Sequence, residues 1–265
     1  MNPFRLTKHF SHPNISAPVG LMGPTELPEM PAETVSVSVP VHEAPKPSQG
    51  AQAQPLMPAD DTPPNLHREI LIVPNFLSAE ICREYVEYIQ GKPEIDLSVF
   101  DAEETNQHGE ISWEVDKHTR DTQTVDIQPI KPVVLDLMHY AVRDFLNPFF
   151  NVAIKDSELP QLLVYHPGGH YRPHIDGEAL FNDGSGVLSW KRNVARDISL
   201  IIYLNNEFEG GEIVFPKQAV GIKPRAGMLV AFPSTHHFLH GVNPVLSGTR
   251  YAIVNWFSLG KPADL

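Results

Sequence analysis

The chain has 265 residues and a formal net charge of −12, and 42% of its residues are hydrophobic. A negative charge of this size repels polyphosphate and anionic lipid, so nucleic acid and membranes are not expected partners. Cys82 is the only cysteine, which excludes an intrachain disulfide framework and thiolate-rich metal sites and indicates a reducing, cytoplasmic location. No apolar run approaches the roughly 20 residues that a membrane-spanning helix needs.

The first quarter of the chain is rich in proline, since half of the 26 prolines precede Asn65. Proline removes backbone donors, and this segment has little apolar surface to offset the entropy of ordering. Residues 1–65 are therefore predicted to be a disordered tail or linker, with the Val35–Val39 alternation as a candidate edge strand that Pro40 would end. An organelle transit peptide is an alternative reading of the first 20 residues.

Residues 66–150 are predicted to be a helical support for the rest of the domain. A serine cap, a glycine stop and apolar residues at three- and four-residue steps mark the helices. The stretch 96–126 is polar and carries no assignment. The expected elements are a buried strand at 69–73, a helix from Ser78 to about Gln90 and a second helix from Pro132 to about Phe150.

Residues 151–258 change to short apolar runs separated by glycine, proline and asparagine, a pattern typical of strands and turns. Eight such runs predict a mainly β fold, a double-stranded β-helix (jelly roll) with the two helices on one outer face. The whole domain is expected to span residues 66–265. The predicted strands are 161–166, 170–176, 198–204, 212–215, 219–223, 227–232, 236–240 and 249–257.

The triplet His174-Ile175-Asp176 is a candidate metal-binding element. In an extended strand, side chains at positions i and i+2 point to the same face, so His174 and Asp176 can hold one ion together. The triplet alone is weak evidence for a metal site, because a strand that ends in two solvated polar residues would give the same sequence pattern. His240, expected on a strand across the barrel, would complete two histidines and one carboxylate, the trio typical of non-haem Fe(II) oxygenases.

Arg250 lies ten residues after His240, at the start of an apolar segment that should be buried. A buried guanidinium requires an anionic partner, and its planar fork matches a carboxylate. That partner is either a nearby acidic side chain or the carboxylate of a ligand.

The segment from Tyr165 to Asp176 resembles the Tyr-x-x-Gly-x-x-Tyr-x-x-His-x-Asp signature of the prolyl 4-hydroxylase-like family of Fe(II)/2-oxoglutarate dioxygenases. Four further blocks follow in family order, so the resemblance covers about residues 160–258. Position 250 is arginine, where the collagen-type prolyl hydroxylases have lysine. In this respect the chain is more similar to the hypoxia-sensing prolyl hydroxylases. The further blocks are Ser199–Asn205, Gly210–Pro216, Pro224–Phe232 and His240 with Arg250.

The resemblance implies a role for individual residues. His174, Asp176 and His240 match the iron ligands and the catalytic centre, and Arg250 matches the residue that binds the distal carboxylate of 2-oxoglutarate. Residues 177–196 fall where the family has a mobile loop over the substrate. Further co-substrate residues by resemblance are Tyr165, Tyr203, Ser199 and Trp256, and further candidate substrate contacts are Trp190, Lys191 and Arg192.

The resemblance also implies the chemistry. The expected activity is hydroxylation of an unactivated C–H bond in a peptidyl proline, a free amino acid or a small metabolite, with 2-oxoglutarate converted to succinate and carbon dioxide. Fe(II) is the implied metal and ascorbate a candidate reductant. Asp176 favours hydroxylation, because related halogenases lack this carboxylate. The oligomeric state is not predicted.

Two other functions stay open at this point. A cupin-type metalloenzyme would use the same barrel without 2-oxoglutarate, and Glu178 would offer it a second carboxylate beside Asp176. A non-catalytic jelly roll would bind a sugar or peptide. His236 and His237 are interpreted as packing or surface residues, and His118 and Arg120 as solvated residues with a less favoured position in the cleft.

Overall fold

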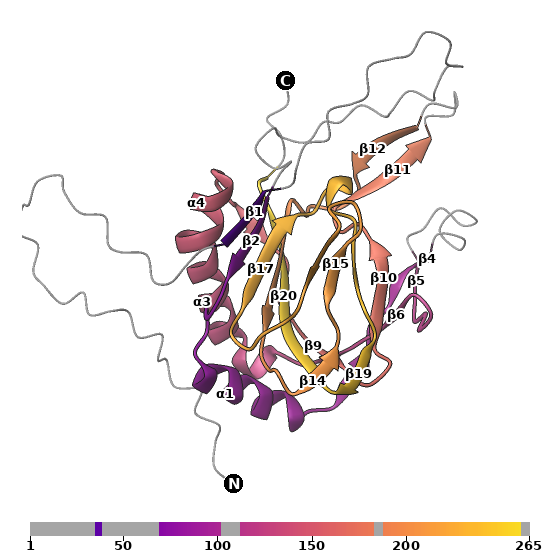
Figure 1. The fold of residues 1–265 in the computed structure, drawn as a ribbon. Helices are drawn as coiled ribbons and strands as arrows, with labels where there is room; N and C mark the ends of the chain where they lie inside the picture. Colours follow the sequence, from indigo (N-terminus) through magenta and orange to yellow (C-terminus); the bar gives the residue numbers. More distant parts are fainter. Residues whose placement is uncertain (1–34, 39–68, 102–111, 183–187, 261–265) are drawn as a thin grey trace, which may run out of the picture.

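The computed structural model describes residues 35–38, 69–101, 112–182 and 188–260, and these are mainly β, as the sequence predicts. Most strands belong to two sheets, of nine and five strands, and apolar side chains pack between these sheets. Figure 1 shows the arrangement of the strands. This arrangement is consistent with the predicted jelly roll. The predicted tail falls outside the described residues except at 35–38, which pairs as an edge strand.

The nine-stranded sheet is antiparallel at every described pairing. Its strands in spatial order are β1 (Val35–Ser38), β2 (Glu69–Val73), β17 (Leu229–Pro233), β13 (Ile198–Tyr203), β20 (Arg250–Ser258), β9 (Gln161–Tyr165), β7 (Gln123–Val125) and β3 (Glu94–Asp96), with β8 (Asp156–Ser157) beside β20.

The five-stranded sheet carries both histidines of the predicted metal site. Its order is β16 (Val220–Ile222), β15 (Ile213–Phe215), β18 (His240–Val242), β10 (His170–His174) and β6 (Arg120–Asp121). The remaining strands form three two-stranded sheets, β11 (Glu178–Asn182) with β12 (Leu188–Arg192), β14 (Phe208–Gly210) with β19 (Val245–Gly248), and β4 (Val99–Asp101) with β5 (Ser112–Glu114).

The helices pack on the outer face of the nine-stranded sheet (Figure 1). Helix α1 spans Ala79–Gln90; the hydroxyl of Ser78 caps it and Gly91 ends it, as the sequence predicts. The second predicted helix is interrupted, since Pro148 lacks the N–H that would continue the regular hydrogen-bond pattern. It consists of α3 (Lys131–Ala141), the π-helical segment η3 (Val142–Leu146) and α4 (Asn147–Phe150), and the 3-10 turn η2 (Gln128–Ile130) precedes it. None of the helices in the described ranges is long and apolar enough to cross a membrane.

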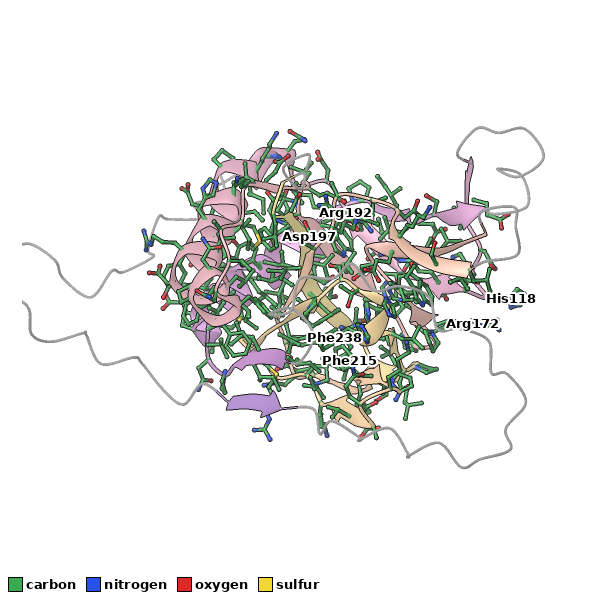
Figure 2. The ribbon with its side chains drawn as sticks, turned by 90° about the horizontal axis from the view of Figure 1, so that it is seen from above. His118, Arg172, Arg192, Asp197, Phe215 and Phe238 are labelled. Atoms are coloured by element: carbon green, nitrogen blue, oxygen red, sulfur yellow. The ribbon has the colours of Figure 1, made fainter. Side chains whose placement is uncertain are left out.

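The two central strands, β13 and β20, are buried along their whole length and divide their side chains between two apolar cores. Because side chains alternate along a strand, Tyr251, Ile253 and Phe257 pack toward the helices. Ala252, Val254 and Trp256 point into the space between the sheets, where Phe215 and Phe238 also lie (Figure 2). Arg250 alternates with Ala252 and Trp256 on β20, and Ser199 alternates with Ile201 on β13, so both side chains face the space between the sheets.

Three local predictions differ from the structure. The predicted strand at 236–240 is wrong, because η4 (His236–Phe238) is a 3-10 turn and β18 begins only at His240. Strand β10 ends at His174, so Asp176 is not part of it. Where a loop was predicted over 177–196, β11 and β12 form an antiparallel hairpin.

Gly227 tests the contact between the loop that precedes α1 and the turn before β17, where the Leu77 N–H donates to the Gly227 carbonyl. Its φ is +78°, and a Cβ at this position would lie 2.2 Å from the carbonyl oxygen of Leu77. We expect Gly227→Ala to lower the free energy of unfolding by about 1–3 kcal/mol from backbone strain alone, measured by urea denaturation. Gly221→Ala is the matched control, because its nearest contact is an ordinary 3.8 Å. Equal stability of the two variants would contradict this account.

Candidate active site

The two histidines meet because β10 and β18 are neighbours in one sheet. His174 and His240 are register partners across this antiparallel pair, just after an irregularity in β10, and their ring centroids lie 4.3 Å apart. The sequence predicted that they would face each other across the barrel, which is wrong. Direct cross-strand pairing brings the two side chains together instead.

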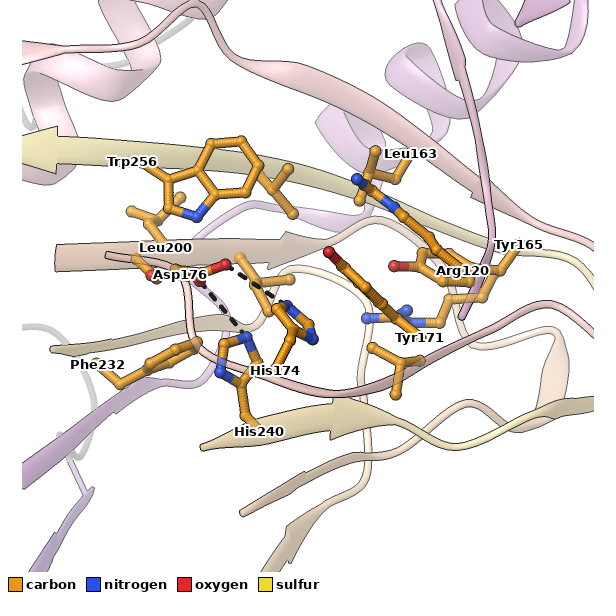
Figure 3. Close-up of a pocket in the computed structure, with 15 residues that line it drawn as sticks. Arg120, Leu163, Tyr165, Tyr171, His174, Asp176, Leu200, Phe232, His240 and Trp256 are labelled. Carbon is orange, nitrogen blue, oxygen red and sulfur yellow. Dashed lines mark hydrogen bonds and ion pairs between the residues drawn. The ribbon is translucent and has the colours of Figure 1, made fainter. Parts of the chain in front are cut away.

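The Asp176 carboxylate completes a cluster whose ligand atoms all lie within 4.8 Å of one another. Its Oδ1 is 3.5 Å from Nε2 of His174 and its Oδ2 is 3.5 Å from Nε2 of His240 (Figure 3). These contacts are too long for hydrogen bonds and are spaced for three donors around a common point. Two imidazoles and one carboxylate fit a divalent transition metal and leave other coordination positions open.

Backbone carbonyls select the ring tautomer that a metal needs. Nδ1 of His174 lies 2.8 Å from the carbonyl oxygen of Arg172, and Nδ1 of His240 lies 3.0 Å from that of Phe238. A carbonyl can only accept, so each Nδ1 carries the proton and each Nε2 presents a lone pair. Burial, reinforced by the neighbouring His174, lowers the pKa of His240 to about 4, which keeps this ligand neutral at physiological pH.

Asp176 is held in its ionised form. Burial opposes ionisation, but the two imidazoles and the Ser199 hydroxyl outweigh it and hold the pKa of Asp176 below its usual range. The Ser199 hydroxyl donates to Oδ2 of Asp176 at 2.6 Å and lies 2.7 Å from the hydroxyl of Ser234. Ser199 therefore fixes the carboxylate directly, while its predicted contact with a co-substrate stays a prediction.

A second network holds the turn η4, which supplies the carbonyl to His240. The Glu178 carboxylate accepts from the backbone N–H of His236 at 2.7 Å and lies 2.6 Å from its ring Nδ1. Trp190, on the other strand of the hairpin, stacks on the His236 ring at 4.8 Å and 2°. Lys217 donates to the His236 carbonyl. Glu178 is thus engaged by His236, where the cupin alternative would make it a metal ligand.

Arg250 lies deep in the same pocket, between two tyrosine rings. Its guanidinium carbon is 4.5 Å from the ring centre of Tyr165, its partner across the sheet, and 5.0 Å from that of Tyr203. Only 1% of the Arg250 surface is exposed. Gly211 leaves room for its aliphatic stem, because a Cβ there would approach Cδ of Arg250 to 3.1 Å.

Polar atoms around Arg250 are available for a ligand. Nε and Nη1 of Arg250 and the hydroxyl of Tyr203 are buried and have no hydrogen-bond partner within the described residues. Burial raises the pKa of Tyr203, although the Arg250 charge opposes this, so the hydroxyl stays a neutral donor. Such donors are costly to leave unpaired, and a carboxylate would satisfy both the fork and the hydroxyl. The residues present therefore fit a metal with a diacid co-substrate.

The other predicted residues fall into two groups. Trp256 lines the pocket, with the Arg196 guanidinium 4.0 Å over its ring. Arg192 is engaged by Asp197 and by the hydroxyl of Ser258, which leaves its predicted substrate contact without support. Trp190 packs on His236. The predicted substrate contact of Lys191 stays a prediction.

Some pocket residues were missed or undervalued by sequence reasoning. Tyr171 stacks on His174 with ring centroids 3.6 Å apart, and its place in the signature motif was the signal that could have indicated it. Arg120 lines the pocket and is only 9% exposed, so its interpretation as a solvated residue is wrong. Phe232 packs against the His240 ring. Phe232 lies in one of the family blocks but was given no role, and the cleft was the less favoured reading of Arg120, since each reaches the site only through long-range strand pairing.

Comparison with known proteins agrees with this geometry. Residues 160–258 match the family model described as the 2OG-Fe(II) oxygenase superfamily. A protein of Acanthamoeba polyphaga mimivirus, provisionally named prolyl 4-hydroxylase, is 28% identical over 196 residues, covering 70% of this chain and 72% of the viral protein. Human prolyl 3-hydroxylase 2 is 38% identical over 78 residues, which cover 26% of this chain and only 11% of that protein.

Among solved structures, the collagen prolyl hydroxylase of Paramecium bursaria Chlorella virus 1, in complex with 2-oxoglutarate, shares the fold with a TM-score of 0.52. Its sequence identity to this chain is 22%, and the match covers 71% of this chain and 94% of the viral one.

The Ser199–Asp176 hydrogen bond predicts a change in metal affinity. We expect Ser199→Ala to weaken Fe(II) binding about 10- to 100-fold, because hydrogen bonds to ligands typically contribute this much. Ser199→Thr keeps the hydroxyl and should retain affinity near that of the wild type. Chelator competition on the apoprotein measures both, and an Ala variant with unchanged affinity would refute the assigned role.

The Glu178–His236 network predicts a weaker but separable effect. Glu178→Ala should reduce Fe(II) affinity about tenfold by loosening the turn that orients His240, whereas Asp176→Ala should abolish binding. Glu212→Ala is the control, since within the described residues the Glu212 carboxylate accepts a hydrogen bond only from the exposed side chain of Asn243. If Glu178→Ala removed binding as completely as Asp176→Ala does, Glu178 would be a ligand and this account would fail.

Proposed function

We propose that this chain is a prolyl 4-hydroxylase-like member of the 2OG-Fe(II) oxygenase superfamily that hydroxylates an unactivated C–H bond. Its cofactor is Fe(II), and 2-oxoglutarate and dioxygen are co-substrates. The substrate is a peptidyl proline or a free amino acid or related small metabolite. One observation carries the proposal: the clustered ligand atoms of His174, Asp176 and His240 share a pocket with the buried guanidinium of Arg250, whose Nε and Nη1 have no hydrogen-bond partner among the described residues.

Each residue has a definite task in this proposal. His174 and His240 hold Fe(II) through Nε2, and Asp176 holds it through a carboxylate fixed by Ser199. Arg250 binds the distal carboxylate of 2-oxoglutarate, with the hydroxyls of Tyr203 and Tyr165 beside it. Trp256 forms a wall of the pocket and helps to exclude water. When bound, the iron would let dioxygen oxidise 2-oxoglutarate to succinate and carbon dioxide, with one oxygen atom entering succinate and the other the C–H bond of the substrate.

The finer architecture belongs to the same proposal. The two facing sheets support a jelly-roll core at 151–258 with helical support at 66–150, in one domain of residues 66–265. The predicted tail at 1–65 lies outside the described residues, apart from the strand at 35–38. The single cysteine supports a reducing, cytoplasmic location. Ascorbate remains a predicted reductant.

Arg250 distinguishes this proposal from the two alternatives. A cupin-type enzyme that does not use 2-oxoglutarate has no need of a buried guanidinium beside the metal. A binding module without catalysis has no need of three converging metal ligands. The engagement of Glu178 by His236 also removes the extra carboxylate that a cupin-like site would use.

Anaerobic loading tests the proposal. Fe(II) and 2-oxoglutarate added together without oxygen should produce a visible metal-to-ligand charge-transfer band. Arg250→Gln should weaken 2-oxoglutarate binding about 10- to 100-fold, from the loss of a charged hydrogen-bonded pair, while Fe(II) affinity is unchanged. Arg250→Lys, which keeps the charge but loses the fork, should fall between. If the wild type gives no band, or oxygen admission with substrate releases no succinate, the proposed function is wrong.

A further inference from the structure

Arg120 is the one pocket arginine to which the proposed function gives no task. It lies on β6 opposite Tyr171 of β10, and it lines the same pocket as the metal ligands (Figure 3). Its guanidinium carbon sits 4.7 Å from the Tyr171 ring centre, and that ring stacks directly on His174. A single aromatic ring therefore separates this cation from an iron ligand.

The Arg120 side chain is buried, and no acidic side chain among the described residues compensates its charge. The residue is 9% exposed, its Nε is buried without a hydrogen-bond partner, and no carboxylate pairs with it within the described ranges. Arg196 is the contrast, because it also stacks on an aromatic ring, that of Trp256 in the pocket wall, but donates to both carboxylate oxygens of Glu158, at 2.5 and 2.8 Å. An aromatic face attracts a guanidinium yet leaves its N–H donors unused.

A buried cation of this kind requires an anion, and the co-substrate does not supply it. Leaving a charge unpaired in a low-dielectric site is costly, so a ligand carboxylate that matches the planar fork is the natural partner. In the proposed function, Arg250 takes the distal carboxylate of 2-oxoglutarate and the metal takes the near one. Both carboxylates of the co-substrate are then accounted for, and Arg120 is left for the substrate.

Resting on the proposed function, we propose that Arg120 determines substrate specificity by binding a carboxylate of the substrate close to the C–H bond that is hydroxylated. The substrate is therefore an anion at this end, through the α-carboxylate of a free amino acid or through an acidic side chain next to the target residue in a peptide. A neutral peptide lacks the group that Arg120 is placed to bind.

Matched probes test the inference on the holoenzyme loaded with Fe(II) and 2-oxoglutarate. One pair is L-proline and L-prolinamide; the other is a terminally blocked tripeptide with aspartate beside proline and the same peptide with asparagine. Each pair differs in one carboxylate. The wild type should favour the carboxylate member of one pair about 10- to 100-fold in kcat/KM for the product heavier by one oxygen. The pair that shows the preference identifies the source of the carboxylate.

Variants assign the preference to Arg120. Arg120→Gln should bring the ratio close to one, and Arg120→Lys should restore part of it. Both should keep the charge-transfer band with Fe(II) and 2-oxoglutarate, which separates lost recognition from misfolding. Arg83→Gln on the exposed face of α1 removes the same charge elsewhere and should leave the ratio unchanged.

Two results overturn the inference: a wild type without carboxylate preference, whether both members of each pair react or neither does, and an Arg120→Gln variant that keeps the preference. If the wild type shows the charge-transfer band but no preference for the carboxylate probes, only the proposed role of Arg120 is wrong. If it shows no band, the proposed function itself is wrong.

Discussion

The antiparallel pairing of β10 with β18 is the constraint on which the site depends. It places His174 and His240 opposite each other, and each ring then donates Nδ1–H to the carbonyl two residues earlier in its own strand or turn. The same local hydrogen bond, from ring to backbone carbonyl, thus orients both histidines, although the two segments are far apart in sequence. Asp176, just beyond the end of β10, needs a different support and receives it from the hydroxyl of Ser199 on the facing sheet. The metal site therefore exists only when both sheets are assembled.

The strands that stabilise the fold also build the pocket. Along β20, residues of one parity pack under the helices, and residues of the other parity, including Arg250 and Trp256, face the site. A slip of one residue in the register of β20 would exchange these two sets, because the side-chain period is two. Apolar packing beneath the helices therefore fixes the position of the guanidinium that is proposed to bind the co-substrate. Stability and co-substrate binding are coupled through the register of one strand.

The parts of the site that lie within one motif could be predicted from sequence, and the parts that depend on distant pairing could not. The triplet at 174–176, His240 and Arg250 were predicted to share one site, and the structure brings them to one pocket. Most core strands were located within a few residues. The reasoning about geometry was less successful: His240 lies on the adjacent strand, Asp176 lies outside the strand, and η4 replaces a predicted strand. The polar stretch containing Arg120 has no hydrophobic period, so its two-residue strand β6 is determined by its neighbour β10. Likewise, Glu178 and His236 are 58 residues apart, and nothing in either segment indicates their contact.

The net charge of the chain and the charges inside the pocket have opposite effects on an anionic ligand. The chain carries a net charge of −12, which at a distance repels a dianion such as 2-oxoglutarate. Within the pocket the sign is reversed, because Arg250 and Arg120 are buried without paired acids in the described residues, while Arg196 is neutralised by Glu158. At physiological ionic strength, charges more than about 8 Å apart in solvent are largely screened, so the global repulsion acts on encounter more than on the bound state. Affinity for anionic ligands is therefore set by desolvated guanidinium groups at fixed positions, and those groups can select a ligand by where its carboxylates lie.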